Sequence, residues 1–312
     1  MEAEFICWLK NKVRPHPQVP LGIGDDAAIL ASDDQHEWVV TTDMLMDGVD
    51  FRLGEVDPRR IGRKALAVNL SDLAAMGATP VCAFVSIAVP QQGALELSKQ
   101  LYEGMIELAN AVKVTIAGGD TNTWEGPLVI SVTAMGTVKR GRAWRRAGAL
   151  PGDVVVVTGE FGGSILGRHL DGGFCYDEAM WWSGEFQIHA AMDVSDGLSL
   201  DLSRLAEASR CGAEIDLEKV PIAAEARQLA ASTGRTPLDH ALGDGEDFEL
   251  ILALSPHEAE RLVKWCEEWG NTYELRTPTI IGRFIPEPGL WTRDAAGNRI
   301  PLPPRGYLHE SK

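Results

Sequence analysis

The chain has 312 residues, which is enough for about two domains of about 150 residues each and excludes a peptide or a disulfide-stapled scaffold. Hydrophobic residues make up 45% of it and charged residues 24%, as in folded globular proteins rather than disordered ones. The 29 Lys and Arg residues against 45 Asp and Glu residues give a formal charge of -16, which repels nucleic acid phosphates and anionic membranes. We therefore expect neither a nucleic-acid-binding nor a membrane-bound protein.

The N-terminus and the cysteines bear on cellular location. Met1–Glu4 is acidic where a signal peptide is basic, and the uncharged apolar stretch Val81–Val89 is about half of what a membrane-spanning helix needs. The cysteines form no C-x-x-C pair and are odd in number, at Cys7, Cys82, Cys175, Cys211 and Cys266. This pattern is typical of free thiols in a reducing compartment. We therefore expect a cytoplasmic protein without a structural zinc site.

The first half of the chain alternates strand-like and helix-like patterns, which predicts a mixed α/β domain. The expected elements are a strand over Trp38–Thr42 that ends at Asp43, a helix from Pro58 to about Met76, a buried strand over Val81–Val89, a helix over Ala94–Val112, and strands over Val114–Ala117 and Leu128–Val138. Asp57 as a cap and Pro58 at the first helical position predict where the first helix begins, and Gly77 predicts its end.

A basic segment, Lys139–Arg146, is followed by glycines and a proline, a composition typical of a linker. Beyond it we expect strands over Val154–Thr158, Ala213–Leu217, Phe248–Leu254, Thr279–Phe284 and Arg299–Leu302, and helices over Leu198–Ser209 and Pro256–Trp269. The sequence thus predicts an N-terminal domain over residues 1–138, a linker over residues 139–152, and an α+β C-terminal domain over residues 153–312.

Acidic residues recur in six segments, each of which also has an ordinary structural interpretation. These interpretations are a turn at Asp25–Asp26, a polar turn at Asp43–Asp50, a helix cap at Ser71 or Asp72, a tight turn or an anion-binding nest at Gly118–Thr121, a helix cap within Asp193–Gly197, and an acidic turn at Gly243–Asp247. Asp72 is the most informative, because on an unbroken helix it shares a face with Ala65 and Val68 and points toward packed surface. A buried carboxylate needs a partner.

If these segments converge, electrostatics requires cations among them. Two carboxylates about 4 Å apart repel by about 4 kcal/mol at an effective dielectric of about 20. Oxygen ligands without Cys or His select hard ions such as Mg²⁺, which prefers to share its coordination with phosphates. EF-hand spacing and the Walker A pattern are both absent. The acidic segments and the glycines at Gly118–Gly119 therefore predict a magnesium and nucleotide phosphate site.

The six motifs occur in an order that resembles the thiamine-monophosphate kinase family. They are Gly22–Ala28, Thr41–Asp43, Lys64–Gly77, Gly118–Thr121, Asp193–Leu198 and Gly245–Leu250, and the resemblance covers nearly the whole chain. Single motifs are shared with the wider superfamily of aminoimidazole ribonucleotide synthetase, selenophosphate synthetase and hydrogenase-maturation protein E. The resemblance implies the two-domain α/β fold of that superfamily, with a mixed-sheet N-terminal domain through which two chains form a homodimer.

The resemblance also implies an ATP-dependent phosphorylation of thiamine monophosphate to thiamine diphosphate, with several Mg²⁺ ions held between the domains. The implied metal ligands are Asp26, Thr41, Thr42, Asp43, Asp72, Asp120, Asp193 and Asp196. The implied ATP contacts are Gly119, Asp120, Arg146 and Ser195, and the implied thiamine monophosphate contacts are Asp50, Glu246 and Tyr307. We expect direct in-line transfer without a general base, because the attacking phosphate oxygen is already ionised near neutral pH.

Two departures from the family pattern stand out. Many members carry His where this chain has Asp50, and members have a longer segment with a Pro-Arg pair where this chain reads Asp171–Asp177. The alternatives are a sister enzyme that acts on a ribotide or on selenide, or a nucleotide-binding relative without turnover. Selenide chemistry would need a reactive Cys in a glycine-rich loop, whereas Cys7 lies in an apolar, helix-like segment.

Overall fold

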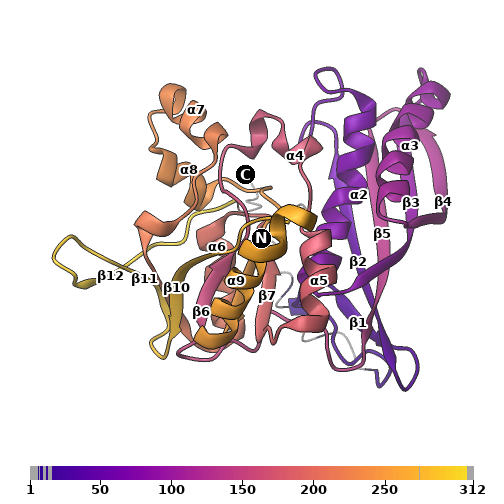
Figure 1. Cartoon of the computed structure of the whole chain (residues 1–312). Coiled ribbons are helices and arrows are strands. Elements are labelled where there is room, and N and C mark those ends of the chain that lie inside the picture. The colour runs from indigo at the N-terminus through magenta and orange to yellow at the C-terminus, as the bar shows by residue number, and fades with distance from the viewer. Residues whose placement is uncertain (1–5, 7, 10–11, 13–15, 274, 308–312) are drawn as a thin grey trace.

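The computed structural model describes residues 6, 8, 9, 12, 16–273 and 275–307. Within these residues the chain forms two domains, each built on one mixed β-sheet with helices packed on it (Figure 1). The predicted two-domain α/β class is therefore confirmed. Met1–Glu4 and Cys7, which entered the predictions on location and on selenide chemistry, lie outside the described residues, and the other four cysteines are free thiols.

The first domain holds a sheet in which strands from distant parts of the segment alternate. Its elements are β1 (Ala28–Ala31), β2 (His36–Met46), α2 (Pro58–Ala75), β3 (Thr79–Pro90), α3 (Ala94–Ala111), β4 (Thr115–Trp124) and β5 (Val129–Lys139). The strand order is β1-β2-β5-β3-β4, and only β3 and β4 are parallel, joined by α3. α2 begins as predicted, because Asp57 accepts a hydrogen bond from the backbone N–H of Arg59 and Pro58 opens the helix.

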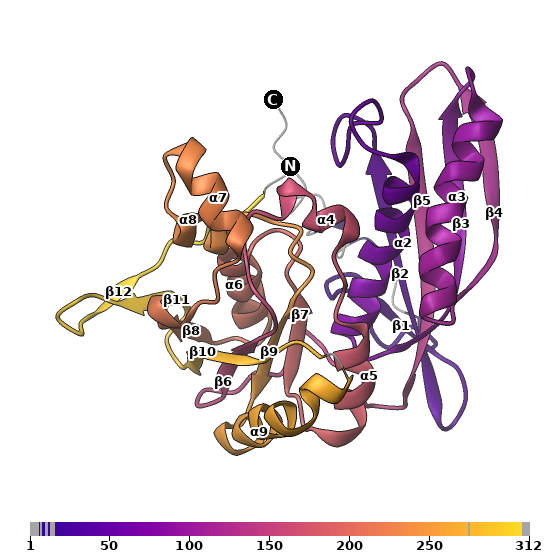
Figure 2. The ribbon, with the colours of Figure 1, turned by 45° about the horizontal axis from the view of Figure 1, so that its top comes forward.

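α2 and α3 touch along their backbones. A Cβ added at Gly62 would lie 1.9 Å from the carbonyl oxygen of Leu101, and one added at Gly104 would lie 1.8 Å from the carbonyl oxygen of Arg59. Only glycine permits an approach this close. Figure 2 shows the two helices together on one side of the first sheet, over a core that includes Ile61, Leu66 and Val85.

The other face of the first sheet is open. In β3 buried and exposed residues alternate, and Val81 and Phe84 are 38% and 42% exposed. On β2, Met44 and Met46 are exposed as well. The prediction of a fully buried strand over Val81–Val89 is therefore wrong, because among the described residues the helices cover only one face of this sheet.

Gly118–Thr121 also differs from the prediction. We expected a turn after a short strand, but these residues continue β4 in parallel pairing with β3. Gly119 has a φ of 155°, and a Cβ there would lie 1.8 Å from the carbonyl oxygen of Val85. This glycine therefore serves a close approach between two strands.

The second domain follows after a connection between Lys139 and Val154 that spans the predicted linker. Its elements are β6 (Val154–Val157), η1 (Ser164–Leu166), α4 (Arg168–Asp171), α5 (Tyr176–Glu185), β7 (Ala190–Asp193), α6 (Leu198–Ala208), β8 (Gly212–Ile215), η2 (Leu217–Lys219), α7 (Ala224–Thr233), α8 (Pro237–Gly243), β9 (Leu250–Leu254), α9 (Pro256–Tyr273), β10 (Thr279–Ile285), β11 (Gly289–Arg293) and β12 (Arg299–Pro301). The strand order is β12-β11-β8-β10-β6-β9-β7. The sequence analysis did not predict α4, α5, β7, α7, α8 or β11.

α2 lies between the first sheet and the second domain (Figures 1 and 2). Its last turn contributes Ala74 and Ala75 to the same apolar cluster as Trp182 of α5 and Ala191 of β7. The helix is therefore buried on two sides, which explains why most of its residues from Ile61 to Ala75 are buried, polar ones such as Asn69 and Ser71 included. Among the described helices, none is long and apolar enough to cross a bilayer.

Candidate active site

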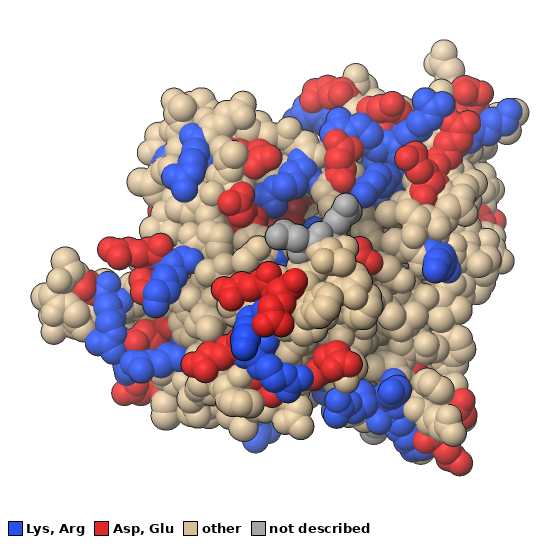
Figure 3. Space-filling view, in the orientation of Figure 1, with Lys and Arg blue, Asp and Glu red and all other residues tan. Residues whose placement is uncertain are grey.

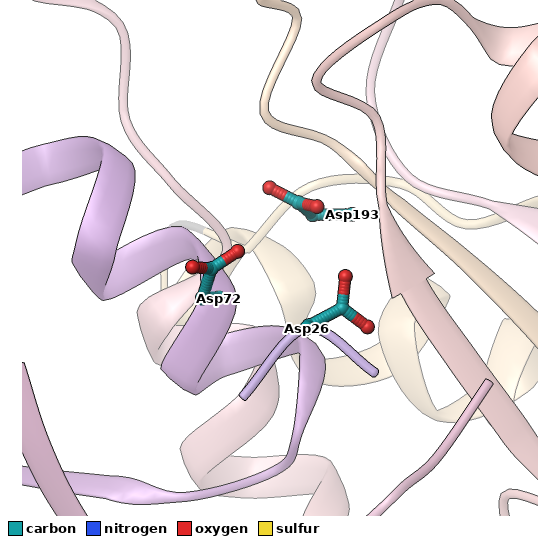
Figure 4. Close-up of side chains that lie close together, drawn as sticks. All are labelled: Asp26, Asp72 and Asp193. Carbon is teal, nitrogen blue, oxygen red and sulfur yellow. The ribbon is translucent and has the colours of Figure 1, made fainter. Parts of the chain in front are cut away.

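Three carboxylates from three separate segments meet at the junction of the two domains. Asp72 comes from α2, Asp193 from the end of β7, and Asp26 from the loop before β1, and each offers an oxygen atom within 4.8 Å of the others. Figure 4 shows the three side chains gathered at this point. Asp26 and Asp193 are buried, at 7% and 2% exposure. These three residues therefore converge as the sequence analysis predicted for the acidic motifs.

Hydroxyl groups hold two of the three carboxylates. Thr41 on β2 donates a hydrogen bond of 2.5 Å to Asp72 Oδ2, and Ser71 donates one of 2.7 Å to Asp193 Oδ2. Burial, and then the charge of Asp193, raises the pKa of Asp72 well above its usual range. Burial, and then the charge of Asp26, does the same to the pKa of Asp193. The shifts have the direction expected of like charges crowded in a site that needs a cation.

Arg146 is the cation that contacts this cluster. Its Nη2 atom donates to Asp26 Oδ1 at 2.7 Å, and its backbone N–H donates to Asp25 Oδ1 at 3.0 Å. Burial opposes the shift, but the charge of Asp26 leaves the pKa of Arg146 raised. Among the described residues Asp26 Oδ2 and Arg146 Nε are buried without a hydrogen-bond partner. Both atoms are therefore available to a bound group.

Asp43 lies beside Asp72 on the covered face of the first sheet. Burial, and then the charge of Asp50, raises the pKa of Asp43 to about 6. Asp50 lies in the loop after β2, where its carboxylate accepts a hydrogen bond of 2.7 Å from the backbone N–H of Met46. The acidic character of the site thus extends from the cluster along the end of β2.

The loops after β7 and before β9 run side by side. The backbone N–H of Glu246 donates to the carbonyl oxygen of Ser195 at 2.7 Å, and that of Tyr307 donates to the carbonyl oxygen of Asp196 at 2.9 Å. Arg204 of α6 forms an ion pair with the carboxylate of Asp196. Ser195, Asp196, Glu246 and Tyr307, which come from distant parts of the chain, therefore share one edge of the site.

A buried lysine connects this edge with the first domain. Lys64 of α2 has no exposed side-chain surface, and its Nζ atom lies 2.5 Å from Glu246 Oε1 and 2.9 Å from the carbonyl oxygen of Asp50. Burial opposes the shift, but His169 and Lys64 together hold the pKa of Glu246 below its usual range. Asp50 and Glu246 are thus tied to one side chain.

Comparison with known proteins places these features in a family. The family model of the AIR synthase related protein N-terminal domain matches residues 24–138 of this chain, and that of the C-terminal domain matches residues 174–290. The chain is 45% identical to the thiamine-monophosphate kinase of Rhodopirellula baltica, over 99% of this chain and 97% of the relative. It belongs to the thiamine-monophosphate kinase family.

Other members of the family agree with this assignment. The thiamine-monophosphate kinase of Bacillus subtilis is 36% identical, over 85% of this chain and 87% of the relative. The solved structure of AaThiL complexed with AMPPCP and TMP superimposes with a TM-score of 0.83 at 27% identity, and covers 99% of this chain and 97% of that one. The fold predicted from the family motifs is therefore confirmed over nearly the full length.

Some family motif residues lie apart from the cluster within one chain. Thr42 points to the open face of the first sheet, where its hydroxyl donates to the carbonyl oxygen of Val132 at 3.2 Å. Gly119 and Asp120 lie on the edge strand β4, and the strand register places Asp43 and Gly119 three strands apart. Three strand spacings amount to about 14 Å. The assignments of Thr42, Gly119 and Asp120 stay predictions.

The sequence analysis missed several residues that shape the site. Lys64 and His169 had no assigned role, and Ser71 was considered only as a helix cap. Asp25 was interpreted as part of a turn, although its carboxylate accepts a hydrogen bond from the backbone N–H of Arg146. Ser71 and Lys64 lie in the quoted family motif, which was the available signal. Helix-cap interpretations of Asp72 and of Asp193–Gly197 are wrong, because α2 is unbroken and α6 has no side-chain cap.

The segment that departs from the family pattern forms a strap between the domains. Asp171 accepts two hydrogen bonds from Arg60 of α2, of 2.8 Å and 2.5 Å, and the carbonyl oxygen of Gly172 accepts one of 3.0 Å from Arg63. Phe174 packs into the core of the first domain. α4, which carries His169, is therefore fixed against α2.

Charge on the outer surface differs from charge in the site. On the face shown in Figure 3, acidic and basic side chains are interspersed, and no single sign covers it. The concentration of one sign of charge at Asp26, Asp72 and Asp193 is internal. This contrast separates the cluster from an ordinary acidic surface.

Proposed function

We propose that this chain transfers the γ-phosphoryl group of ATP to thiamine monophosphate and so produces thiamine diphosphate. The observation that carries the proposal is the convergence of Asp26, Asp72 and Asp193, from three family motifs in two domains, on one buried point. Membership of the thiamine-monophosphate kinase family supports the choice of substrate. The bound AMPPCP, an ATP analogue, and TMP in the similar structure of AaThiL support ATP as the phosphoryl donor.

The donor set of the cluster fits Mg²⁺. All three groups offer oxygen, and Asp26 Oδ2 is buried without a partner among the described residues. Hard divalent cations prefer such oxygen ligands. We propose Asp26, Asp72 and Asp193 as ligands, with Thr41 and Asp43 beside them and Thr42, Asp120 and Asp196 as further ligands. Bound Mg²⁺ would neutralise phosphate charge, which is its usual contribution to phosphoryl transfer.

The residues of the chain would supply position rather than covalent chemistry. We propose direct in-line transfer, in which an oxygen of the substrate phosphate forms a bond to the γ-phosphorus as the bond to ADP breaks. No general base is needed, because that oxygen is ionised near neutral pH. Arg146, fixed through Asp25 and Asp26, would orient phosphates with its remaining donors.

ATP would lie against the edge of the first domain. Gly119 and Asp120 are on β4, and a cavity of about 430 Å³ beside that strand is lined by Tyr102, Ile106, Ala109, Asn110, Val114, Thr115 and Ile116. An aromatic ring, apolar walls and one amide suit a purine base. Ile116 and Asp120 are four residues apart, about 13 Å along a strand, a span that the triphosphate and ribose could bridge. Ser195 is proposed as a further ATP contact.

Thiamine monophosphate would meet the opposite edge. Asp50, Glu246 and Tyr307 are the proposed contacts, and the backbone bonds of Glu246 and Tyr307 to Ser195 and Asp196 support their common location. Tyr307 is 52% exposed and presents a ring to solvent. A cationic thiazolium would be attracted both to carboxylates and to an aromatic face.

We further propose a homodimer formed through the first sheet. Its open face carries Met44, Met46 and Phe84, which are 59%, 38% and 42% exposed. Among the described residues, the outer edge of β4 and the part of β2 beyond its pairing with β1 have no neighbouring strand. Within one chain Asp43 and Gly119 lie about 14 Å apart, and a second copy would instead bring the Asp120 of one chain to the carboxylate cluster of the other.

The test is turnover by the purified chain with ATP, Mg²⁺ and thiamine monophosphate. We expect thiamine diphosphate in stoichiometric amounts with ADP, and inversion of configuration at a chiral γ-phosphate. No thiamine diphosphate under these conditions would overturn the proposal. Retention of configuration would instead refute the in-line step and indicate a phosphorylated enzyme intermediate.

A further inference from the structure

Lys64 contacts two of the proposed substrate residues, Asp50 of the first domain and Glu246 of the second. Among the described residues, no other side chain has a hydrogen bond or ion pair to both. Lys64 is fully buried, and its ammonium group lies near three polar atoms. These are the carbonyl oxygen of Asp50 at 2.9 Å, Glu246 Oε1 at 2.5 Å and His169 Nδ1 at 3.1 Å. An ammonium group donates hydrogen bonds and accepts none, so Lys64 binds one oxygen of each domain at the same time.

His169 Nδ1 lies beside the same carboxylate, 3.0 Å from Glu246 Oε2. A proton on Nδ1 donates to this oxygen, which agrees with the lowered pKa of Glu246. Lys64 therefore holds Glu246 Oε1 and His169 holds Oε2, on a side chain that is 32% exposed.

The backbone of Glu246 is fixed as well. Its φ is +60°, an unusual value for a residue other than glycine, and its N–H donates to the carbonyl oxygen of Ser195 at 2.7 Å. With Lys64 and His169 on the side chain and Ser195 on the main chain, the carboxylate of Glu246 has a defined direction.

We propose that Lys64 is a positioning residue that sets the distance between the Asp50 loop and Glu246, with His169 holding the second oxygen of the Glu246 carboxylate. The inference rests on the proposed function, because it assigns these groups to the binding of thiamine monophosphate. It predicts that Lys64 acts on this substrate and hardly at all on ATP, whose proposed contacts at Gly119 and Arg146 it does not touch.

The experiment compares four variants by steady-state kinetics with each substrate varied in turn. Lys64→Met keeps the length of the side chain and removes its donors, and His169→Leu removes the donor to Glu246 Oε2. His169→Asn retains an N–H donor near the place of Nδ1. Arg59→Met is the matched control, because Arg59 lies on the same helix but is exposed and pairs with Glu103 at 2.7 Å. Circular dichroism and thermal unfolding establish that each variant is folded.

We expect Lys64→Met to raise the KM for thiamine monophosphate by about 10- to 100-fold, the effect of losing charge-assisted hydrogen bonds. The KM for ATP should change by no more than about twofold. His169→Leu should raise the first KM less, His169→Asn should restore it, and Arg59→Met should leave both unchanged. A purely structural role would instead change both KM values, or kcat alone.

Other kinetic results would contradict the proposed role of Lys64. An unchanged KM for thiamine monophosphate in Lys64→Met, or equal changes for both substrates, overturns the inference while leaving the proposed function in place. If Lys64→Met does not fold, the comparison of His169→Leu with His169→Asn decides, and equal kinetics in these two variants overturns the inference. If the unaltered chain makes no thiamine diphosphate, the proposed function fails and the inference falls with it.

Discussion

Replacement of Asp72 by Asn should separate stability from activity. Asp72 offers an oxygen within 4.8 Å of ligand atoms on both Asp26 and Asp193. At that distance each pair of full charges repels by about 3 to 4 kcal/mol at an effective dielectric of about 20. The chain relieves part of this cost by proton uptake, because burial and neighbouring charge raise the pKa of Asp72 and of Asp193. We therefore expect Asp72→Asn to stabilise the metal-free chain by about 1 to 3 kcal/mol at pH 8.

The assay is thermal unfolding with a chelator and then with Mg²⁺, alongside turnover. A gain of about 1 to 3 kcal/mol corresponds to a rise in Tm of about 2 to 10 °C. Mg²⁺ should raise the Tm of the unaltered chain and leave that of Asp72→Asn almost unchanged, while turnover of the variant falls by about 100-fold or more. Asp34→Asn is the control, because Asp34 is fully exposed, pairs with Arg140 and is not a member of the cluster. Near-normal turnover in Asp72→Asn, or an unaltered response to Mg²⁺, would falsify the reasoning.

Three further results are expected. Because burial raises the pKa of Asp43 to about 6, the folded metal-free chain keeps a proton that the unfolded chain loses near pH 4, so this residue lowers stability as the pH rises from about 4 to about 6. In chelator, the Tm of Asp43→Asn should therefore rise relative to that of the unaltered chain from about pH 4 to about pH 6 and level off above it, and a constant difference over that range would count against the shift. Glu246→Gln should raise the KM for thiamine monophosphate by about tenfold with little effect on ATP, and an equal effect on both substrates would argue against its assignment. Asp72→Asn and Asp120→Asn should each be inactive alone and should regain activity when they are co-expressed. The reason is that a mixed dimer contains one site with both unaltered aspartates. No recovery of activity would place Asp120 in the site of its own chain.

Local signals predicted much of the fold. Asp57, Pro58 and Gly77 predicted α2 to within a residue, and β5, α3, α6 and β10 follow the expected patterns closely. The charge argument predicted that separated acidic motifs converge, and Asp26, Asp72 and Asp193 do so. These successes share a cause, because capping, periodicity and like-charge repulsion depend on residue types that the sequence states directly.

The features that the sequence did not predict depend on contacts between residues distant in the chain. Lys64 meets His169 across 105 positions, and no local pattern of a lysine on a helix predicts a buried partner in another domain. Gly118 and Gly119 resemble a turn because glycine favours both turns and close strand approach, and only the neighbouring Val85 decides between them. The short helices α4 and α5 rest on packing against α2, which their own residues do not reveal.

The burial of α2 between two domains limits how substrates can enter. A hinge motion that opened the junction would expose Ala75 and Trp182, both fully buried, and would break the contacts of Asp171 with Arg60. Domains joined through an apolar interface do not part readily. We expect the two sheets to keep a fixed orientation through the catalytic cycle, with admission and release left to the loops that carry Asp50 and Tyr307. Rates of product release should then respond to changes in those loops and be insensitive to the length of the connection between Lys139 and Val154.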